Sequence, residues 1–136
     1  MMDDRPQTLR EVSLRTMRGE QSFDPALREF LDTFYATPGG RIEGLRERPE
    51  LIDAVHDAYL AAVAEHVARV FSLPVPEWSE THGFALSQPF FAGGLESLKA
   101  VLTVESPTAF RRRLLFVSKD ALSRPRLQRN ATFTTS

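Results

Sequence analysis

The chain has 136 residues, of which 42% are apolar and 26% charged, which fits one globular domain with a modest core and excludes a disordered chain. It contains no cysteine, so disulfides, thiolate metal sites and cysteine nucleophiles are excluded as well. The net charge is −1, and no apolar run approaches the roughly 18–20 residues that span a bilayer, so we expect no membrane partner. The N-terminus is polar and acidic, so we expect a cytoplasmic protein with no secretory signal.

Two amphipathic helices are predicted in the N-terminal part of the chain. In residues 7–18 apolar side chains recur at near-helical spacing, and Gly19 ends the pattern. The next helix is expected to begin at Asp24-Pro25, an N-cap acid followed by proline at the first helical position, and to end at residues 37–40, Thr-Pro-Gly-Gly. Its apolar positions fall on one stripe, which consists of Leu27, Phe30, Leu31, Phe34 and Tyr35.

The longest predicted helix follows a short helix or turn at residues 41–48. From about residue 50 to Phe71, apolar residues recur every three or four positions with no glycine or proline between them, which predicts a helix of about 22 residues. Its many alanines allow close approach of neighbouring elements, so we expect it at the centre of the fold. Pro74 begins a break in the pattern, after which Trp78 is expected to fold back over the core.

Shorter elements are predicted in the C-terminal half. Residues 79–92 look irregular, and residues 93–102 begin with two glycines and continue with leucine and valine at helical spacing. Ser106-Pro107 resembles an N-cap with proline at the first helical position, which predicts a short helix with Phe110 inside. Residues 114–117 are apolar enough for a short strand, but no partner strand is evident.

These elements together predict an all-α fold. We expect a single-domain, irregular helical bundle around one long central helix, extending over residues 1–124. Residues 125–136 are polar and show no periodic pattern, so they are expected to form a flexible tail.

No constellation of residues in the sequence is typical of catalysis or metal binding. Asp53 and His56 have the i, i+3 spacing of two metal ligands, but a third ligand is missing, so a polar surface contact is the favoured interpretation. His66 lies on the apolar stripe of the long helix and is expected to be a core or interface histidine. The glycine pairs lack the spacing of a phosphate loop, and no serine lies in a nucleophile elbow. We therefore expect no enzymatic activity, no metal and no cofactor.

The consecutive arginines Arg111, Arg112 and Arg113 form the main candidate for binding. A helix has 3.6 residues per turn, so at most two of them share a face. One is expected to pack its aliphatic stem against Phe110 or Phe116 while the others project outward. Three interpretations stay open: contact with nucleic-acid phosphates, ion pairing with an acidic cleft of a protein partner, and simple solvation.

Charge is distributed unevenly along the chain. Residues 1–65 hold thirteen acidic and eight basic side chains, whereas residues 66–136 hold five acidic and nine basic ones. The basic C-terminal part is suited to phosphate or to an acidic partner, and the N-terminal part predicts an acidic helical surface. The residues expected on that acidic surface are Glu29, Asp32, Asp53 and Asp57.

Several segments resemble those of a group of small bacterial helical proteins that are similar to antitoxin partners of nucleotidyltransferase-like toxins. The resemblance extends from about residue 24 to residue 124, and the segments that carry it are residues 28–35, 57–62, 89–91, 109–118 and 121–124. It implies a protein without enzymatic activity that neutralises a toxin encoded by a neighbouring gene. No catalytic residue is implied by the resemblance.

The sequence therefore predicts a protein-binding neutraliser, the antitoxin of a toxin–antitoxin pair, that occludes a nucleotidyltransferase-like toxin. The alternative is a small DNA-binding transcriptional regulator that uses the basic C-terminal segment, although no helix-turn-helix pattern is evident. Aromatic residues in irregular segments fill a core or anchor an interface, and arginine is common in interfaces. The candidate partner-binding residues are Phe90, Phe91, Phe110, Arg111, Arg112, Arg113 and Phe116.

Overall fold

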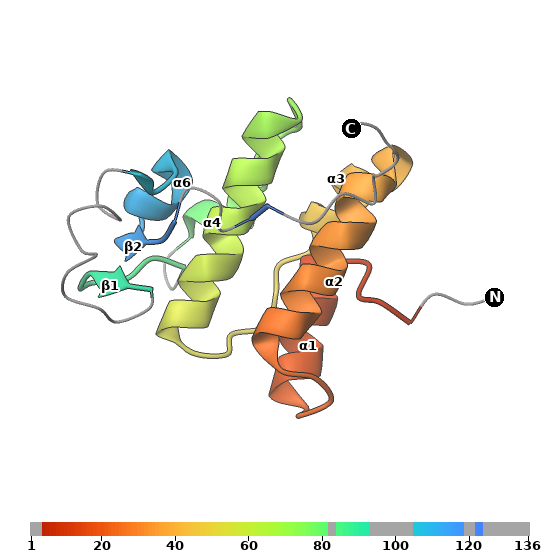
Figure 1. Cartoon of the computed structure of the whole chain (residues 1–136), viewed down its shortest axis with the longest axis horizontal. Coiled ribbons are helices and arrows are strands. Elements are labelled where there is room, and N and C mark those ends of the chain that lie inside the picture. The colour runs from red at the N-terminus through yellow and green to blue at the C-terminus, as the bar shows by residue number, and fades with distance from the viewer. Residues whose placement is uncertain (1–3, 82–83, 93–104, 119–121, 124–136) are drawn as a thin grey trace.

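The computed structural model describes residues 4–81, 84–92, 105–118 and 122–123 of the chain (Figure 1). Within these ranges most residues are helical, which confirms the predicted all-α class. The helices are α1 (Leu9–Met17), α2 (Phe23–Ala36), α3 (Arg41–Arg46), α4 (Ala54–Val70) and α6 (Thr108–Arg111). Two 3-10 turns, η1 (Pro38–Gly40) and η2 (Glu77–Glu80), and two short strands, β1 (Phe90–Phe91) and β2 (Leu115–Phe116), connect or accompany them.

α1 and α2 pack against each other at the N-terminal end of the fold. α1 begins after Thr8, whose hydroxyl accepts a hydrogen bond from the backbone N–H of Glu11 at 3.0 Å. It ends before Gly19, whose φ of 71° is a left-handed conformation that glycine adopts readily. The predicted N-cap of α2 was wrong, because Ser22 occupies that position and Asp24 lies in the first turn. A carboxylate in the first turn still interacts favourably with the helix dipole.

α2 lies beside α4 and runs in the same direction (Figure 1). Near their N-terminal ends the rings of Phe23 and Tyr59 lie 5.9 Å apart, and near their C-terminal ends the rings of Phe34 and Phe71 lie 5.7 Å apart. The predicted stripe of α2 is confirmed as the side that enters the core: Leu27, Phe30, Leu31 and Phe34 are buried and Tyr35 is partly buried.

α4 is the central helix, but it begins later than predicted. Asp53 is its N-cap, because the carboxylate accepts a hydrogen bond from the backbone N–H of His56 at 2.9 Å. The backbone N–H of Ile52 donates to the Asp57 carboxylate at 2.6 Å, so the segment before the helix is bonded to its first turn. Figure 1 shows α4 between the N-terminal helices on one side and α6 with the two strands on the other. Its small side chains are buried on several sides, as expected for a helix with neighbours all around.

Trp78 covers the core as predicted. It lies in η2, is 7% exposed, and its indole N–H donates a hydrogen bond to the backbone carbonyl of Leu45 at 2.9 Å. The ring of the buried Phe84 meets the Trp78 ring edge-on, with centroids 5.2 Å apart. This hydrogen bond joins η2 to α3, and the two bonded residues lie 33 positions apart in the chain.

A two-stranded parallel sheet supplies the partner strand that the sequence did not reveal. Phe90 pairs with Leu115 and Phe91 with Phe116, so β1 arises from the segment that was expected to be irregular. The expectation for Ser106 was wrong as well. Its hydroxyl is buried and bonds both the N–H and the carbonyl of Val117, at 2.8 and 2.9 Å, while the N-cap position of α6 belongs to the next residue, a proline.

Two further predictions lie outside the described residues. They are the helix expected in residues 93–102 and the polar tail at residues 125–136.

Candidate functional site

The arginine triplet folds back on α4 instead of projecting from the surface as a unit. Arg113 is only 3% exposed, and its guanidinium donates hydrogen bonds to Glu65, to Glu80 and to the backbone carbonyl oxygens of Ser79 and Ala109. One arginine was expected to pack inward, and that residue is Arg113. It is held mainly by carboxylates and carbonyls.

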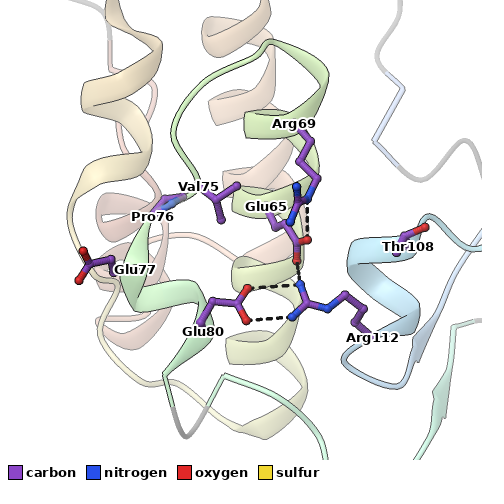
Figure 2. A pocket seen from close by; sticks show the side chains of 8 residues that line it. All are labelled: Glu65, Arg69, Val75, Pro76, Glu77, Glu80, Thr108 and Arg112. Carbon is purple, nitrogen blue, oxygen red and sulfur yellow. Dashed lines mark hydrogen bonds and ion pairs between the residues drawn. The ribbon is translucent and has the colours of Figure 1, made fainter.

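Glu65 on α4 is the centre of this arrangement, although it is only 1% exposed. Its Oε1 accepts hydrogen bonds from Arg112 and Arg113, each at 2.6 Å, and its Oε2 accepts one from Arg69 at 2.8 Å. Glu80 on η2 completes the set by accepting from Arg112 at 2.9 Å (Figure 2). We call these five side chains the ion-pair cluster. It connects α4, η2 and the residues at the end of α6.

The surroundings of Glu65 favour its charged form. Burial alone raises the pKa of a carboxyl group, but the hydrogen bonds from Arg113, Arg69 and Arg112 outweigh it and lower the pKa of Glu65 to about 2. The hydrogen bond from Arg112 likewise lowers the pKa of Glu80. In return, the hydrogen bonds to Glu80 and Glu65 raise the pKa of Arg112. Glu65, Glu80 and Arg112 are therefore charged at neutral pH.

A shallow cavity of about 600 Å³ lies beside the ion-pair cluster. Figure 2 shows Arg112 reaching across it from the α6 side toward Glu65 and Glu80, with Val75 and Pro76 on the opposite wall. Four of the five charged side chains in its wall, Glu65, Glu80, Arg69 and Arg112, already pair with one another, and the fifth, Glu77, lies outside the ion-pair cluster. We therefore interpret the ion-pair cluster as a connection within the fold.

The predicted partner-binding residues divide into buried and exposed members. Phe110 is fully buried, with its ring 5.1 Å from that of Tyr59, so it cannot anchor a partner in this structure. Arg113 is also buried, so it cannot contact a partner in this structure either. Arg111 is exposed, and its guanidinium makes a long hydrogen bond of 3.5 Å to the hydroxyl of Thr108.

The aromatic residues of the two strands form the part of the predicted site that does reach the surface. The rings of Phe91 and Phe116 are stacked, with centroids 4.7 Å apart and planes at 17°, and both side chains are partly buried. Phe90 on the same strand is 41% exposed. We call Phe90, Phe91 and Phe116 the aromatic patch. Parallel pairing of β1 and β2 brings Phe91 onto Phe116, although they come from segments about 25 residues apart, and Phe90 pairs with the buried Leu115.

The other charged and titratable candidates have local roles. Asp53 and His56 lie as expected, with the imidazole Nδ1 2.7 Å from the carboxylate. His66 is partly buried near the ring of Phe110, and burial lowers its pKa. Asp57 was expected on an acidic surface, but it is buried and bonded to a backbone N–H, so that prediction was wrong for this residue. Within the described ranges, no group of three or more potential ligand side chains is placed to hold a metal ion.

Sequence reasoning missed Glu65, the residue on which the ion-pair cluster depends. Its i, i+4 spacing to Arg69 was a visible signal, since such pairs interact on a helix. That spacing did not reveal that the same carboxylate also binds arginines 47 and 48 residues further along the chain.

No protein-family model matches this chain, and no curated protein or solved structure matches it significantly. The resemblance to antitoxin-like proteins therefore stays a prediction. In the part of the chain that the structure describes, every helix is too short or too polar to cross a membrane.

Proposed function

We propose that this chain is a cytoplasmic protein-binding neutraliser without enzymatic activity of its own. In its specific form, the proposal is that it is the antitoxin of a toxin–antitoxin pair and occludes a nucleotidyltransferase-like toxin encoded by a neighbouring gene. The proposed contact surface is the aromatic patch together with Arg111, which are the members of the predicted set that are exposed or partly exposed and take no part in the ion-pair cluster.

The observation that carries the proposal is the engagement of Arg112 and Arg113 by Glu65 and Glu80. Binding to DNA depends largely on arginines and lysines that neutralise phosphates. Two of the three arginines offered for that purpose already have carboxylate partners at 2.6–3.2 Å. These ion pairs therefore argue against a basic surface that binds DNA. An exposed aromatic side chain together with one arginine fits the usual composition of a protein interface.

The test is co-purification of the tagged chain with the product of the neighbouring gene. Phe90→Ser should reduce recovery of the partner strongly, since aromatic anchors carry much of the energy of an interface. Met17→Ser is the matched control, because Met17 is also an exposed apolar side chain but lies on α1, away from the strands. Equal recovery with both variants would remove the aromatic patch from the proposal.

The DNA-binding alternative is tested with the wild-type chain and Arg111→Ala. Fluorescence anisotropy with a labelled duplex should show no tight binding at physiological salt. If the chain is instead a regulator, binding should be tight at low salt and fall steeply as salt is raised, because each phosphate contact releases counterions. That result, with no protein partner recovered, would favour the alternative. Replacing all three arginines would not discriminate, since loss of Arg112 and Arg113 also removes the ion-pair cluster.

A further inference from the structure

A second surface, separate from the aromatic patch, has the features of a binding groove. It lies between α3 and the segment that joins α4 to η2, and it has a volume of about 440 Å³. Its floor is formed by Leu45 and Trp78, which are almost fully buried, and Ile42 and Pro74 are exposed on its sides. We call it the α3 groove. It adjoins the cavity beside the ion-pair cluster through Pro76 and Glu77.

The apolar part of the α3 groove is unusually accessible. Ile42 is 44% exposed, although most large aliphatic side chains of the described residues are buried in the core. The hydrogen bond from the Trp78 indole to the Leu45 carbonyl joins η2 to α3 and so fixes the two residues of the floor relative to each other. An apolar hollow of this size suits one large aliphatic or aromatic side chain of a partner.

Charged residues at the rim of the α3 groove indicate which residues of the partner lie next to the apolar side chain that enters it. Arg48 lines the groove, and among the described residues its guanidinium contacts the ring of Phe84 at 5.7 Å but pairs with no carboxylate. Within the described ranges Arg46 pairs with Glu43 alone, at 3.4 Å with both side chains about two-thirds exposed, and such an exposed ion pair is weak. Two arginines at the rim of an apolar hollow therefore offer charge complementarity to carboxylates.

We propose that the α3 groove binds a segment of a protein partner in which a large apolar side chain has aspartate or glutamate next to it on one side. The apolar side chain enters the groove beside Ile42, and the carboxylates pair with Arg48 and Arg46. Glu77 lies on the other side of the groove, and in Figure 2 it points away from Glu80 and the ion pairs. It disfavours a segment that is acidic on both flanks and so sets the direction of the bound segment. This proposal does not depend on the chain being an antitoxin.

The experiment selects binders for the full-length chain from a displayed library of random twelve-residue peptides. The enriched peptides should share a large apolar residue next to aspartate or glutamate. Binding of a synthetic enriched peptide is then followed by tryptophan fluorescence, because Trp78 is the only tryptophan in the sequence and lies in the floor of the groove. Peptides without a common apolar and acidic pattern, or with a basic one, would overturn the proposal.

Two substitutions locate the bound peptide. Ile42→Ser should weaken binding at least about tenfold, as expected for the central apolar contact of an interface. Arg48→Glu should weaken it about threefold to tenfold by replacing an attractive charge with a repulsive one. The matched control is Arg18→Glu, which makes the same charge change at an exposed position at the end of α1. All three positions are wholly or partly solvent-exposed, and circular dichroism should show that the variants keep the wild-type fold.

Two other outcomes would contradict the proposal. If neither groove variant changes affinity relative to Arg18→Glu, the peptides bind elsewhere and the proposal is wrong. If the chain forms a dimer in sedimentation that Ile42→Ser dissociates, the occupant is a second copy and not a separate partner. Failure of these tests leaves the Phe90 co-purification result unaffected, because the aromatic patch and the α3 groove share no residue.

Discussion

Neutralising Glu65 tests whether the ion-pair cluster stabilises the fold. Glu65→Gln keeps the size of the side chain and one carbonyl acceptor but removes the charge that faces Arg69, Arg112 and Arg113. Removing one partner of a buried ion pair typically costs about 3–5 kcal/mol, and here the charge of Arg113 stays buried with Glu80 as its remaining carboxylate partner. Whole domains are stable by about 5–15 kcal/mol, so the variant should be severely weakened but still folded in mild conditions.

The pKa of Glu65 gives an independent magnitude. A carboxyl with an ordinary pKa of 4.5 that is held at about 2 in the folded state contributes about 3 kcal/mol at neutral pH. Because the folded state has the lower pKa, the contribution is complete above pH 4.5 and is lost as pH falls toward 2. The Gln variant lacks this contribution at every pH. The difference in stability between wild type and variant should therefore be largest near neutrality and shrink below pH 4.5.

Urea denaturation at pH 7 and pH 3, followed by Trp78 fluorescence and by circular dichroism, measures both effects. Glu43→Gln is the matched control, since its ion pair with Arg46 is exposed on both sides and should contribute no more than about 0.5 kcal/mol. If Glu65→Gln unfolds at the wild-type urea concentration, the ion-pair cluster does not stabilise the fold. If the loss of stability is the same at both pH values, the charge of Glu65 is not its source.

Two further substitutions test the placement of α4. Val63→Asp puts a charge at a fully buried position in the middle of the helix and should cost about 3–5 kcal/mol, measured by thermal unfolding; unchanged melting would mean that this side of the helix is exposed. Asp53→Ala removes the N-cap bond to His56 and should cost about 1 kcal/mol in urea denaturation, whereas an effect near zero would place the start of the helix elsewhere.

Features that depend on neighbouring residues were predictable from the sequence. The stripe of α2 and the alanine-rich α4 were found because apolar periodicity marks the buried side of a helix. Helix starts were less certain, since Ser22 and Asp24 are both good capping residues. The structure places Phe23 inside α2, where its ring contacts His56 and Tyr59. That tertiary contact selects Ser22 as the N-cap, and the sequence of residues 22–24 alone does not reveal this choice.

Features that depend on distant residues were not predictable. Pairing of β1 with β2 joins two dipeptides, and such short strands have no sequence pattern of their own. The bond between Glu65 and Arg113 spans 48 residues, and any of the three consecutive arginines was an equal candidate for it. The aromatic patch depended on the same pairing, because only the register of the strands brings Phe91 onto Phe116.

The ion-pair cluster also changes the meaning of the uneven charge along the sequence. The acidic N-terminal part contributes Glu65, and the basic C-terminal part contributes Arg112 and Arg113, so part of the imbalance is compensated inside the fold. Apolar contacts alone would hold α6 against α4 without selecting one position along the helix, whereas charge pairs with fixed hydrogen-bond geometry select one. We infer that two arginines of the triplet set the position of the C-terminal segment on α4. That leaves Arg111 as the member of the triplet whose substitution tests binding without disturbing the cluster.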